Sequence, residues 1–328
     1  MIVVTGGAGF IGSNLLAGLE EHGAKELVVC DTLGQGDKWR NIAKRELADI
    51  VAPASLLDFL KARRGRIQAV FHLGAVSSTT ETDADLILRA NFAASLEIWN
   101  HCAANGVPLI YASSAATYGD GSLGFDDDST VAGLKTLRPL NAYGWSKHLF
   151  DRRVARLIAE REPAPPQWAG LKFFNVYGPN EYHKGEMRSV IAKNFEAARK
   201  AEPIRLFKSY RPGYADGGQK RDFVWVDDCV AVMLWLLVTP GTSGLFNLGT
   251  GKARSFADLA AALYRALGAE PRIEYIEMPE SLRPRYQYFT EARLERLREA
   301  GYTAPFTALE DGVRDYVTSY LLNEDPYR

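Results

Sequence analysis

The sequence predicts an α/β protein built on a doubly wound parallel sheet, with a smaller α/β substrate-binding domain toward the C-terminus. Two observations support this prediction. In the first half of the chain, short apolar and β-branched runs alternate with stretches of helical spacing. In the second half the pattern is more mixed, and its helices and short strands do not continue the regular alternation.

The first predicted unit is a strand, a glycine-rich turn and a helix. Residues 2–4 (Ile-Val-Val) are apolar and β-branched, which is typical of a strand buried in a parallel sheet. Residues 7–12 (Gly-Ala-Gly-Phe-Ile-Gly) match G-x-G-x-x-G, and residues 13–21 carry leucines at helical spacing. Such glycines let the backbone approach a pyrophosphate, and the helix N-terminus offers amides to phosphates. The unit predicts a dinucleotide-binding turn; a glycine-rich turn of another α/β protein is the alternative.

Further strand and helix signals extend the sheet. Residues 27–30 predict a second strand, and Asp31 follows it at the distance expected of a carboxylate that binds a ribose. After a polar helix, strands are predicted at residues 69–71, 109–111 and 171–174, with long helices at 86–105 and 141–159. Right-handed crossovers would bring the C-terminal ends of the strands to one edge of the sheet, where ligands bind.

The second half of the chain predicts helices, one strand and two loops. The helices are expected at residues 189–201, 228–238, 255–267 and 291–300, the strand at 223–226, a short apolar segment at 245–248, and the loops at 162–166 and 211–219. We therefore predict a dinucleotide-binding domain of residues 1–174 plus 223–246 and a substrate-binding domain of residues 175–222 plus 247–328.

Composition argues for a globular protein that acts on a small molecule. The chain has 328 residues, 47% of them hydrophobic, and its formal net charge of −1 gives no sign of a nucleic-acid or membrane-surface partner. No stretch has the apolar length of a membrane span and the first strand begins at once, so we expect a cytoplasmic protein without a signal peptide. Cys30, Cys102 and Cys229 are expected to be reduced core residues and His72 to be structural. No metal site is expected.

Three residues point to proton and hydride transfer at an alcohol. Tyr143 and Lys147 are spaced i and i+4, which places them on one face of the predicted helix. Ser114 follows a predicted strand, where a parallel sheet presents its ligands. Oxidation of an alcohol requires a base, and a nearby ammonium together with a cationic nicotinamide would lower the pKa of a tyrosine. Because Y-x-x-x-K is common on helix surfaces, the motif gains its weight from the glycine-rich turn and the serine.

With these residues in place, the chain resembles the extended short-chain dehydrogenase/reductase superfamily and, within it, the ADP-L-glycero-D-manno-heptose 6-epimerase family. The resemblance covers almost the whole chain, and SSTTE and EYHKG are more particular to the heptose epimerases than the glycine-rich stretches. It implies a Rossmann domain that holds a nicotinamide dinucleotide and a smaller C-terminal domain that holds an ADP-sugar. The matching stretches are TGGAGFIGSN from Thr5, GAVSSTTETD from Gly74, YASSAATYG from Tyr111, FFNVYGPNEYHKG from Phe173, KRDFVWVDD from Lys220, FNLGTG from Phe246 and RYQYFT from Arg285.

The resemblance also implies a reaction, the inversion of C6 in ADP-D-glycero-β-D-manno-heptose by transient oxidation and reduction on the opposite face, which supplies lipopolysaccharide core assembly. Tyr143 would be one acid–base group and Lys184 the second. Ser114 would hold the reacting hydroxyl, and Lys147 would bind the ribose and tune Tyr143. Two acid–base groups are expected because an exocyclic aldehyde that rotates in place turns its oxygen toward a different proton donor. Residues 115–116 are both alanine, which argues against a dehydratase, since elimination of water needs a general acid there.

The expected cofactor is NADP, with NAD as the alternative. Asp31 suits the 2′-hydroxyl of NAD and repels the 2′-phosphate of NADP, but Lys38 and Arg40 follow closely and offset this repulsion. The family is associated with NADP, although Pro53 stands where its pattern has a second lysine. The residues expected to bind the cofactor are Gly6, Gly7, Gly9, Phe10, Ile11, Gly12, Asp31, Thr32, Lys38, Leu73, Gly74, Ala75, Val76, Ser77, Asn91, Lys147, Val176 and Lys184.

The resemblance assigns a second set of residues to the ADP-sugar. The guanidinium of Arg221 suits a diphosphate. Glu186 replaces a smaller residue of the family pattern, and the chain is longer than that pattern at residues 211–219. The set comprises Ser114, Asn175, Glu186, Lys193, Phe207, Lys208, Ser209, Arg221 and Tyr286.

The resemblance further implies a homo-oligomer, with a pentamer as the first expectation, and neither nucleic acid nor a membrane as partner. Two alternative functions stay open at this point. One is another nucleotide-sugar epimerase or reductase, such as one of the UDP-glucose 4-epimerase type. The other is a non-catalytic dinucleotide sensor on the same scaffold.

Overall fold

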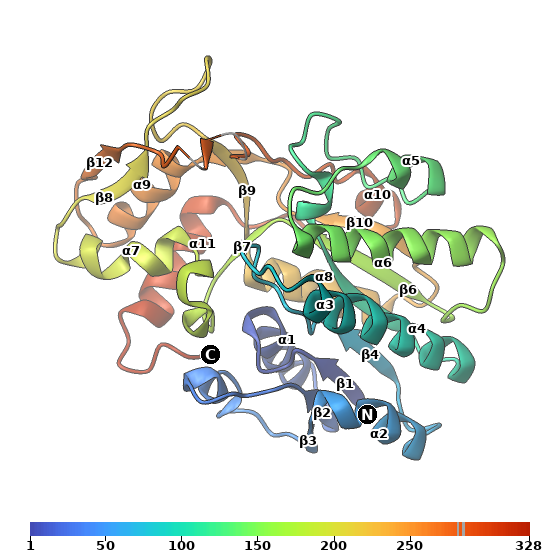
Figure 1. Ribbon diagram of the computed structural model, residues 1–328. Coiled ribbons are helices and arrows are strands. Elements are labelled where there is room, and N and C mark those ends of the chain that lie inside the picture. The colour runs from blue at the N-terminus through green and yellow to red at the C-terminus, as the bar shows by residue number, and fades with distance from the viewer. Residues whose placement is uncertain (281, 284–285) are drawn as a thin grey trace.

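A seven-stranded parallel sheet forms the centre of the protein (Figure 1). The computed structural model describes residues 1–280, 282–283 and 286–328. The strand order is β10-β6-β5-β4-β1-β2-β3, so the order reverses between β1 and β4, where such sheets bind ligands. The strands are β1 (Ile2–Thr5), β2 (Leu27–Cys30), β3 (Asp49–Val51), β4 (Ala69–His72), β5 (Leu109–Ser114), β6 (Trp168–Phe173) and β10 (Gly244–Leu248).

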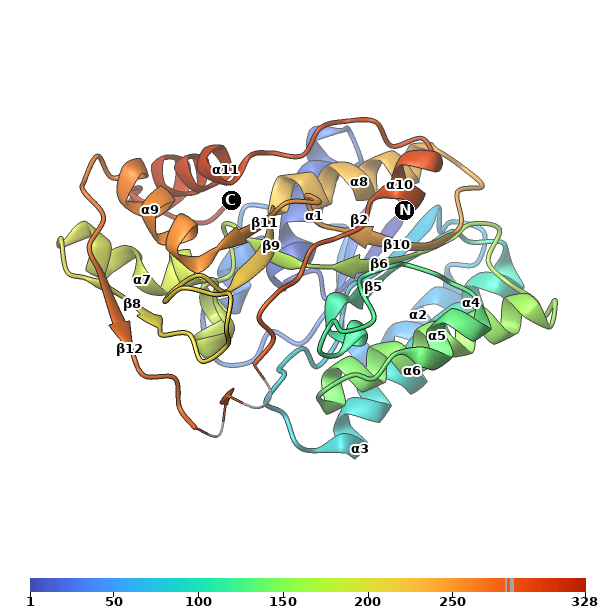
Figure 2. The same ribbon diagram turned by 90° about the horizontal axis from the view of Figure 1, so that it is seen from above.

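Helices cover both faces of this sheet. Figure 2 shows α1 (Phe10–Glu21) and α8 (Val226–Val238) on one side, and α2 (Leu56–Ala62), α4 (Ala94–Asn105) and α6 (Ala142–Ala159) on the other. The alternation of side chains along each strand feeds two separate cores. Val3 and Val28 belong to the core under α4 and α6, whereas Val4 and Val29 belong to the core under α1 and α8. Burial on both faces explains why these strands read as continuous apolar runs.

A smaller part of the molecule packs around a third core, with α7 (Val190–Arg199), α9 (Phe256–Ala266) and α11 (Leu309–Tyr316) around two small sheets (Figure 1). One sheet has the order β11-β9-β7, and the other pairs β12 with β8. Their strands are β7 (Asn175–Tyr177), β8 (Ile204–Phe207), β9 (Lys220–Trp225), β11 (Ala253–Ser255) and β12 (Ile273–Ile276). The remaining helices are α3 (Ala84–Ile87), α5 (Val131–Thr136) and α10 (Glu295–Glu299), and short 3-10 or π turns lie at Asp37–Ile42, Pro53–Ser55, Leu88–Ala93, Ala115–Tyr118, Tyr182–Met187 and Val317–Leu321.

The strands predicted at residues 2–4, 27–30, 69–71, 109–111 and 171–174 are all present in the parallel sheet. The predicted helix at 86–105 begins at Ala84 and includes a π turn at residues 88–93. The strand predicted at 223–226 begins earlier, at Lys220, and belongs to the small sheet beside β7.

The prediction of a helix over residues 291–300 was wrong in its first part, because α10 begins only at Glu295. The preceding segment is extended along β9: the amide of Lys220 donates to the Tyr288 carbonyl, and the amide of Thr290 donates to the Lys220 carbonyl. Beyond Thr290, the amide of Ala292 donates to the Asp222 carboxylate at 2.9 Å, and the carbonyl of Arg293 accepts a hydrogen bond from the Asn247 side chain at 3.0 Å. Contacts with distant elements thus override the local helical spacing. The stretch RYQYFT begins at Arg285, which lies outside the described residues.

The structure also bears on the residues expected to be inert. Cys30, Cys102 and Cys229 are buried and unbridged. His72 is enclosed between the hydroxyls of Thr5 and Ser95, at 2.7 and 2.8 Å, as expected of a structural histidine. Among residues 1–280, 282–283 and 286–328, no helix combines the length and apolar character that crossing a bilayer requires. The same described residues contain no cluster of histidine, cysteine and carboxylate groups suited to a metal ion.

Candidate active site

A cavity of about 1370 Å³ lies at the C-terminal edge of the main sheet, between the two parts of the molecule. The loops after β1, β4, β5 and β6 form one wall. Residues 183–184 and 187–191, together with residues from β9 and α9, form the opposite wall. The parallel strands therefore bring their C-terminal ends to one place, as their connections predict.

The glycine-rich turn forms the floor of this cavity. Gly6 has a φ of +67°, and a Cβ atom there would lie 2.6 Å from the amide nitrogen of Gly74. The turns after β1 and β4 can approach this closely because residue 6 is glycine, which has no Cβ and tolerates the positive φ. Gly9 precedes α1, and no described side chain caps the first turn of that helix. The amides of this turn are therefore available to a phosphate, so the site fits a dinucleotide pyrophosphate.

Asp31 lies at the end of β2 and organises the rim of the turn. Its carboxylate accepts hydrogen bonds from the amides of Ala8 and Thr32, at 3.0 and 2.7 Å. The same carboxylate forms an ion pair with the Nζ of Lys38 at 2.6 Å. Lys38 thus neutralises Asp31 and places a cation at the rim of the glycine-rich turn.

The helix α6 carries Tyr143 in its first turn and Lys147 one turn later. Asn141 caps the helix, since its side chain accepts a hydrogen bond from the amide of Gly144 at 2.8 Å. The Nζ of Lys147 donates to the Ala112 carbonyl at 2.9 Å, which fixes the lysine against β5. Both side chains line the cavity, as does Ser114 at the end of β5. The predicted trio is therefore assembled in space.

Burial dominates the protonation of this trio. It raises the pKa of Tyr143, while a hydrogen bond with the Ser114 hydroxyl acts in the opposite direction. It lowers the pKa of Lys147 to about 8, an effect that Asp151 opposes. Lys147 was expected to lower the pKa of Tyr143. In the protein without cofactor the pKa of Tyr143 is instead raised, because desolvation of the phenolate outweighs the hydrogen bond from Ser114.

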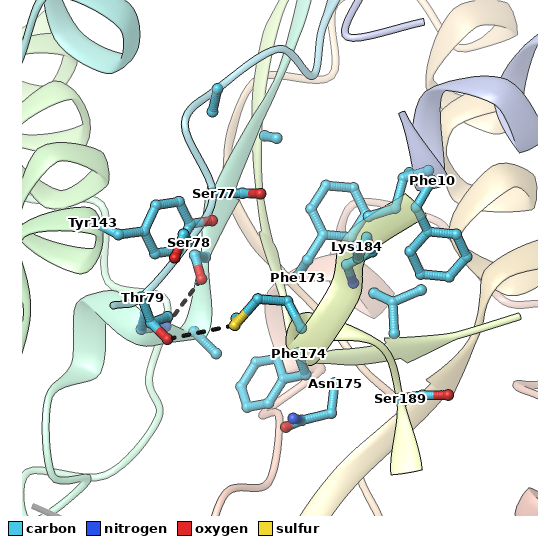
Figure 3. Close-up of a pocket in the computed structure, with 18 of the residues that line it drawn as sticks. Phe10, Ser77, Ser78, Thr79, Tyr143, Phe173, Phe174, Asn175, Lys184 and Ser189 are labelled. Carbon is cyan, nitrogen blue, oxygen red and sulfur yellow. Dashed lines mark hydrogen bonds between the residues drawn. The ribbon is translucent and has the colours of Figure 1, made fainter. Parts of the chain in front are cut away.

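Lys184 lies on the other side of the cavity (Figure 3). Its Nζ lies 4.9 Å from the centroid of the Phe10 ring, in the first turn of α1. Burial lowers the pKa of Lys184, whereas the carboxylate of Glu181 raises it. A lysine with a lowered pKa exchanges protons more readily near neutral pH.

A buried carboxylate anchors the segment that carries Lys184. Glu181 accepts hydrogen bonds from the amide and hydroxyl of Ser189, at 2.5 and 2.6 Å, and from the hydroxyl of Tyr316 at 3.2 Å. The segment is also tied to the main sheet domain, because Asn180 donates to the Ser13 hydroxyl at 3.0 Å. Lys184 is therefore held by contacts on both sides of its loop.

Arg221 on β9 is a buried cation at the far end of the cavity, 9% exposed. Its Nη1 donates to the Lys220 carbonyl at 2.8 Å, and its guanidinium lies 5.4 Å from the Tyr286 ring centroid and 5.7 Å from that of Phe256. In the described part of the chain no carboxylate pairs with it. A buried cation without a counterion fits an anionic ligand such as a diphosphate.

The structure brings most of the predicted site residues to the cavity wall. Those that line it are Gly6, Gly9, Phe10, Ile11, Gly12, Asp31, Lys38, Leu73, Gly74, Ala75, Ser77, Ser114, Tyr143, Lys147, Asn175, Val176, Lys184, Arg221 and Tyr286. Those that lie outside the lining are Gly7, Thr32, Val76, Asn91, Glu186, Lys193, Phe207, Lys208 and Ser209.

Physical reasons keep several of these residues away from the wall. Asn91 is buried behind it and holds the loop after β4, since its side chain bonds both the amide and the carbonyl of Val76. Lys193 forms an ion pair with Glu186 at 3.2 Å, and Lys208 pairs with Glu277 at 2.7 Å, both on the protein surface. Phe207 packs edge-on against Tyr286, with ring centroids 6.2 Å apart.

Several residues of the lining were not predicted from the sequence. Thr79 and Met187 come from opposite loops and touch over the cavity, with 3.9 Å between the hydroxyl and the sulfur (Figure 3). The stretches SSTTE and EYHKG mark these two loops, and Met187 follows the second stretch by two residues. The other lining residues that the predictions omit include Ser78, Thr80, Glu81, Thr82, His183, Arg188, Ser189 and Gln287.

The cavity carries a surplus of positive charge. Lys38, Lys147, Lys184, Arg188 and Arg221 line it, against the carboxylates of Asp31 and Glu81. Among the described residues, five cations against two carboxylates line the cavity, a balance that suits ligands carrying phosphates.

Comparison with known proteins places this site in a family. The model of the "NAD dependent epimerase/dehydratase family" matches residues 2–249. An ADP-L-glycero-D-manno-heptose-6-epimerase of Nitratidesulfovibrio vulgaris (strain DP4) is 52% identical over 330 residues, covering 100% of both chains. The crystal structure of the Helicobacter pylori ADP-L-glycero-D-manno-heptose-6-epimerase superposes with a TM-score of 0.78 at 28% identity, covering 97% of this chain and 95% of that one.

A second solved structure is similar, that of the Thermus thermophilus UDP-glucose 4-epimerase in complex with NAD. It has a TM-score of 0.76 at 26% identity, and the match covers 96% of this chain and 97% of that one. The identity of 52% with the heptose epimerase over the full length is twice the 26% identity with the UDP-glucose 4-epimerase. The chain belongs to the NAD dependent epimerase/dehydratase family and, within it, to the group of the ADP-L-glycero-D-manno-heptose-6-epimerases.

Proposed function

We propose that the protein inverts C6 of ADP-D-glycero-β-D-manno-heptose to give ADP-L-glycero-β-D-manno-heptose. One observation carries the proposal: two proton-transfer groups, Tyr143 and Lys184, line one cavity on opposite sides. The full-length likeness to named heptose epimerases supports the choice of substrate. The reaction is an isomerisation, since hydride leaves one face of C6 and returns to the other.

The two groups divide the proton transfers. Oxidation at C6 removes a proton from the C6 hydroxyl, and one of the two groups accepts it while Ser114 holds the oxygen. The exocyclic aldehyde then rotates about the C5–C6 bond, which turns its oxygen toward the opposite group. That group donates a proton as reduction occurs at the other face. A single base could not serve both positions of the oxygen, because the sugar ring stays in place.

A bound nicotinamide dinucleotide would accept the hydride from C6 and return it. Residues of the glycine-rich turn and the amides at the start of α1 would hold its pyrophosphate. Lys147 would bind the nicotinamide ribose and keep an ammonium close to the phenol of Tyr143. We propose NADP rather than NAD, because Lys38 already neutralises Asp31 and offers its ammonium to a 2′-phosphate.

At the other end of the cavity, Arg221 would pair with the diphosphate of the sugar nucleotide. Tyr286 lines the same region, and Phe207 packs behind it. We further propose that the protein is cytoplasmic. We also propose a homo-oligomer, which the family resemblance implies; light scattering of the purified protein tests the oligomeric state.

A direct assay tests the proposed function. The purified protein is denatured and the released dinucleotide is identified by mass, and the native protein is incubated with ADP-D-glycero-β-D-manno-heptose. The C6 epimer should accumulate to an equilibrium mixture without net reduction of added cofactor. Turnover of UDP-galactose with none of the ADP-heptose would replace the proposal by a 4-epimerase, and the absence of turnover of either would favour a dinucleotide sensor.

A further inference from the structure

A fully buried ion pair lies directly behind the trio of Ser114, Tyr143 and Lys147. The Nζ of Lys172 on β6 lies 2.7 Å from the Oδ2 of Asp151 on α6, and both side chains are 0% exposed. Asp151 follows Lys147 by one helical turn, so it extends the same face of α6 into the core. The pair is not part of the cavity lining, and the proposed chemistry does not use it.

The side-chain hydrogen bonds of the pair lead to β5 and to the turn that follows it, next to Ser114. The Tyr111 hydroxyl on β5 donates to Asp151 at 3.3 Å. Asp151 accepts a hydrogen bond from the Ser113 hydroxyl at 2.6 Å, one residue before Ser114. Lys172 donates to the Thr117 hydroxyl at 2.8 Å, which in turn donates to the Ser114 carbonyl at 2.8 Å. The pair therefore links β5, β6 and α6 through hydrogen bonds.

We propose that Asp151 and Lys172 are positioning residues, which hold α6 against β5 and β6 and set the electrostatic environment of Lys147. The inference rests on the proposed function for the roles of Tyr143 and Lys147. A buried ion pair contributes little to stability compared with apolar residues of the same volume, whereas its hydrogen bonds constrain the geometry of the elements that it joins. Its hydrogen bonds fix the register between the helix and the strand that must meet at the reacting oxygen.

The charge of Asp151 acts on Lys147 and Tyr143 through the core. It opposes the lowering of the Lys147 pKa that burial causes, and it raises the pKa of Tyr143. Lys172 offsets part of this negative charge. The other titratable groups that the charges of the pair or of Lys147 reach are Tyr111 on β5, Tyr118 on the following turn, His72 on β4 and His148 on α6. The charges of Arg138 and Arg152 act on His148 as well.

The two single variants should shift the pH dependence of cofactor binding in opposite directions. Asp151→Asn removes the negative charge, so Lys147 loses its proton at lower pH. The alkaline limb of the binding profile, in which NADP⁺ affinity falls as pH rises, therefore moves to lower pH. Lys172→Met leaves Asp151 unpaired, so this limb moves up. We expect shifts of about one pH unit, as neighbouring charges cause. Tryptophan fluorescence measures the NADP⁺ dissociation constant from pH 6 to about 10, where unshifted lysines begin to titrate.

Two further variants separate charge from geometry. The double variant Asp151→Asn/Lys172→Met should give a limb between those of the two single variants and a kcat at least about tenfold lower, since general acid–base groups contribute about 10²–10⁴-fold only when positioned. Lys172→Arg should leave the limb in place. Glu196→Gln, in an exposed ion pair on α7, is the matched control and should change neither quantity.

A purely structural role would give a different result. If both single variants lost affinity with the limb unmoved, or moved it in the same direction, the proposal would be overturned. Should the single variants not fold, the double variant decides, and a wild-type kcat in it would overturn the proposal. The binding measurement needs no sugar, so opposite shifts in a protein that does not turn over ADP-heptose would refute the substrate while supporting the inference.

Discussion

Tyr143 and Lys184 line one cavity from opposite sides, although separate elements carry them: α6 carries the phenol, and the segment after β7 carries the amine. Figure 3 shows Tyr143 on the side of Ser77, Ser78 and Thr79, and Lys184 on the side of Phe10. The relationship allows one group to accept a proton from the C6 hydroxyl and the other group to donate its own proton to the oxygen after it has turned between the two walls. Removing each group in turn tests this division.

Tyr143→Phe and Lys184→Met should each lower epimerase turnover by about 10²–10⁴-fold, since each removes one proton-transfer group. Tyr143→Phe should still bind the dinucleotide with nearly unchanged affinity. The turnover of the double variant should be only a little lower than that of the slower single variant, because the effects of residues that act together in one reaction are not additive. Initial rates by chromatography of the two epimers provide the measurement.

Exposed residues of the same types supply the controls for this prediction. Tyr275→Phe on β12 and Lys200→Met after α7 should leave turnover within about twofold, because surface substitutions rarely perturb stability or the site. Near-normal turnover of Lys184→Met would show that this lysine takes no part in proton transfer.

Arg221→Lys should raise the KM for the sugar nucleotide by about 10- to 100-fold and change kcat less. The lysine keeps the positive charge but loses the planar pair of donors, and hydrogen bonds to charged groups contribute about 1.5–3 kcal/mol. Steady-state kinetics measure both constants. Arg205→Lys, whose side chain is 64% exposed on β8, is the control. An unchanged KM would remove Arg221 from the diphosphate site.

Lys38→Ala should weaken binding of NADP⁺ by about tenfold or more and change NAD⁺ binding much less, because a charge-assisted contact to the 2′-phosphate is lost and Asp31 is left unneutralised. Isothermal titration with each dinucleotide gives the two affinities. The exposed Lys25→Ala provides the comparison. Equal effects on both dinucleotides would argue that Lys38 does not select the cofactor.

His72 should make stability fall as the solution becomes acidic. Burial, followed by the charge of Lys147, lowers the pKa of His72 from 6.5 to about 3. The unfolded chain therefore binds a proton below pH 6.5 that the folded protein takes up only near pH 3, so stability is lost as pH falls through this window. Between pH 7 and pH 5 the loss from this one group is about 2 kcal/mol.

Denaturant unfolding at the two pH values measures this effect. His72→Gln has no proton to gain, so its free energy of unfolding should depend less on pH by about this amount, about 2 kcal/mol. His22→Gln, at an exposed position at the end of α1, is the matched control and should retain the wild-type dependence. If the free energy of unfolding of His72→Gln depended on pH as that of the wild type does, His72 would have the same pKa in the folded protein as in the unfolded chain.

Local patterns were enough to predict the parallel sheet and the glycine-rich turn. Residues 2–4 and 27–30 are buried on both faces, so their apolar runs are readable without knowledge of their neighbours. Short strands such as β3, β7 and β11, each of three residues, were missed. Such segments carry no period of their own, and pairing with a distant partner makes them strands.

Local spacing along the chain was enough to predict the candidate groups of the site: the phenol and ammonium spaced one turn apart on α6, the serine after β5 and the glycine-rich turn. Which of these groups lie together depends on the packing of the whole fold. That packing placed Lys184 beside Phe10, left Arg221 without a carboxylate in the described part of the chain, and buried Asp151 against Lys172. The physical reason is that local spacing sets the face of a helix, whereas burial and pairing depend on elements that are distant in the chain.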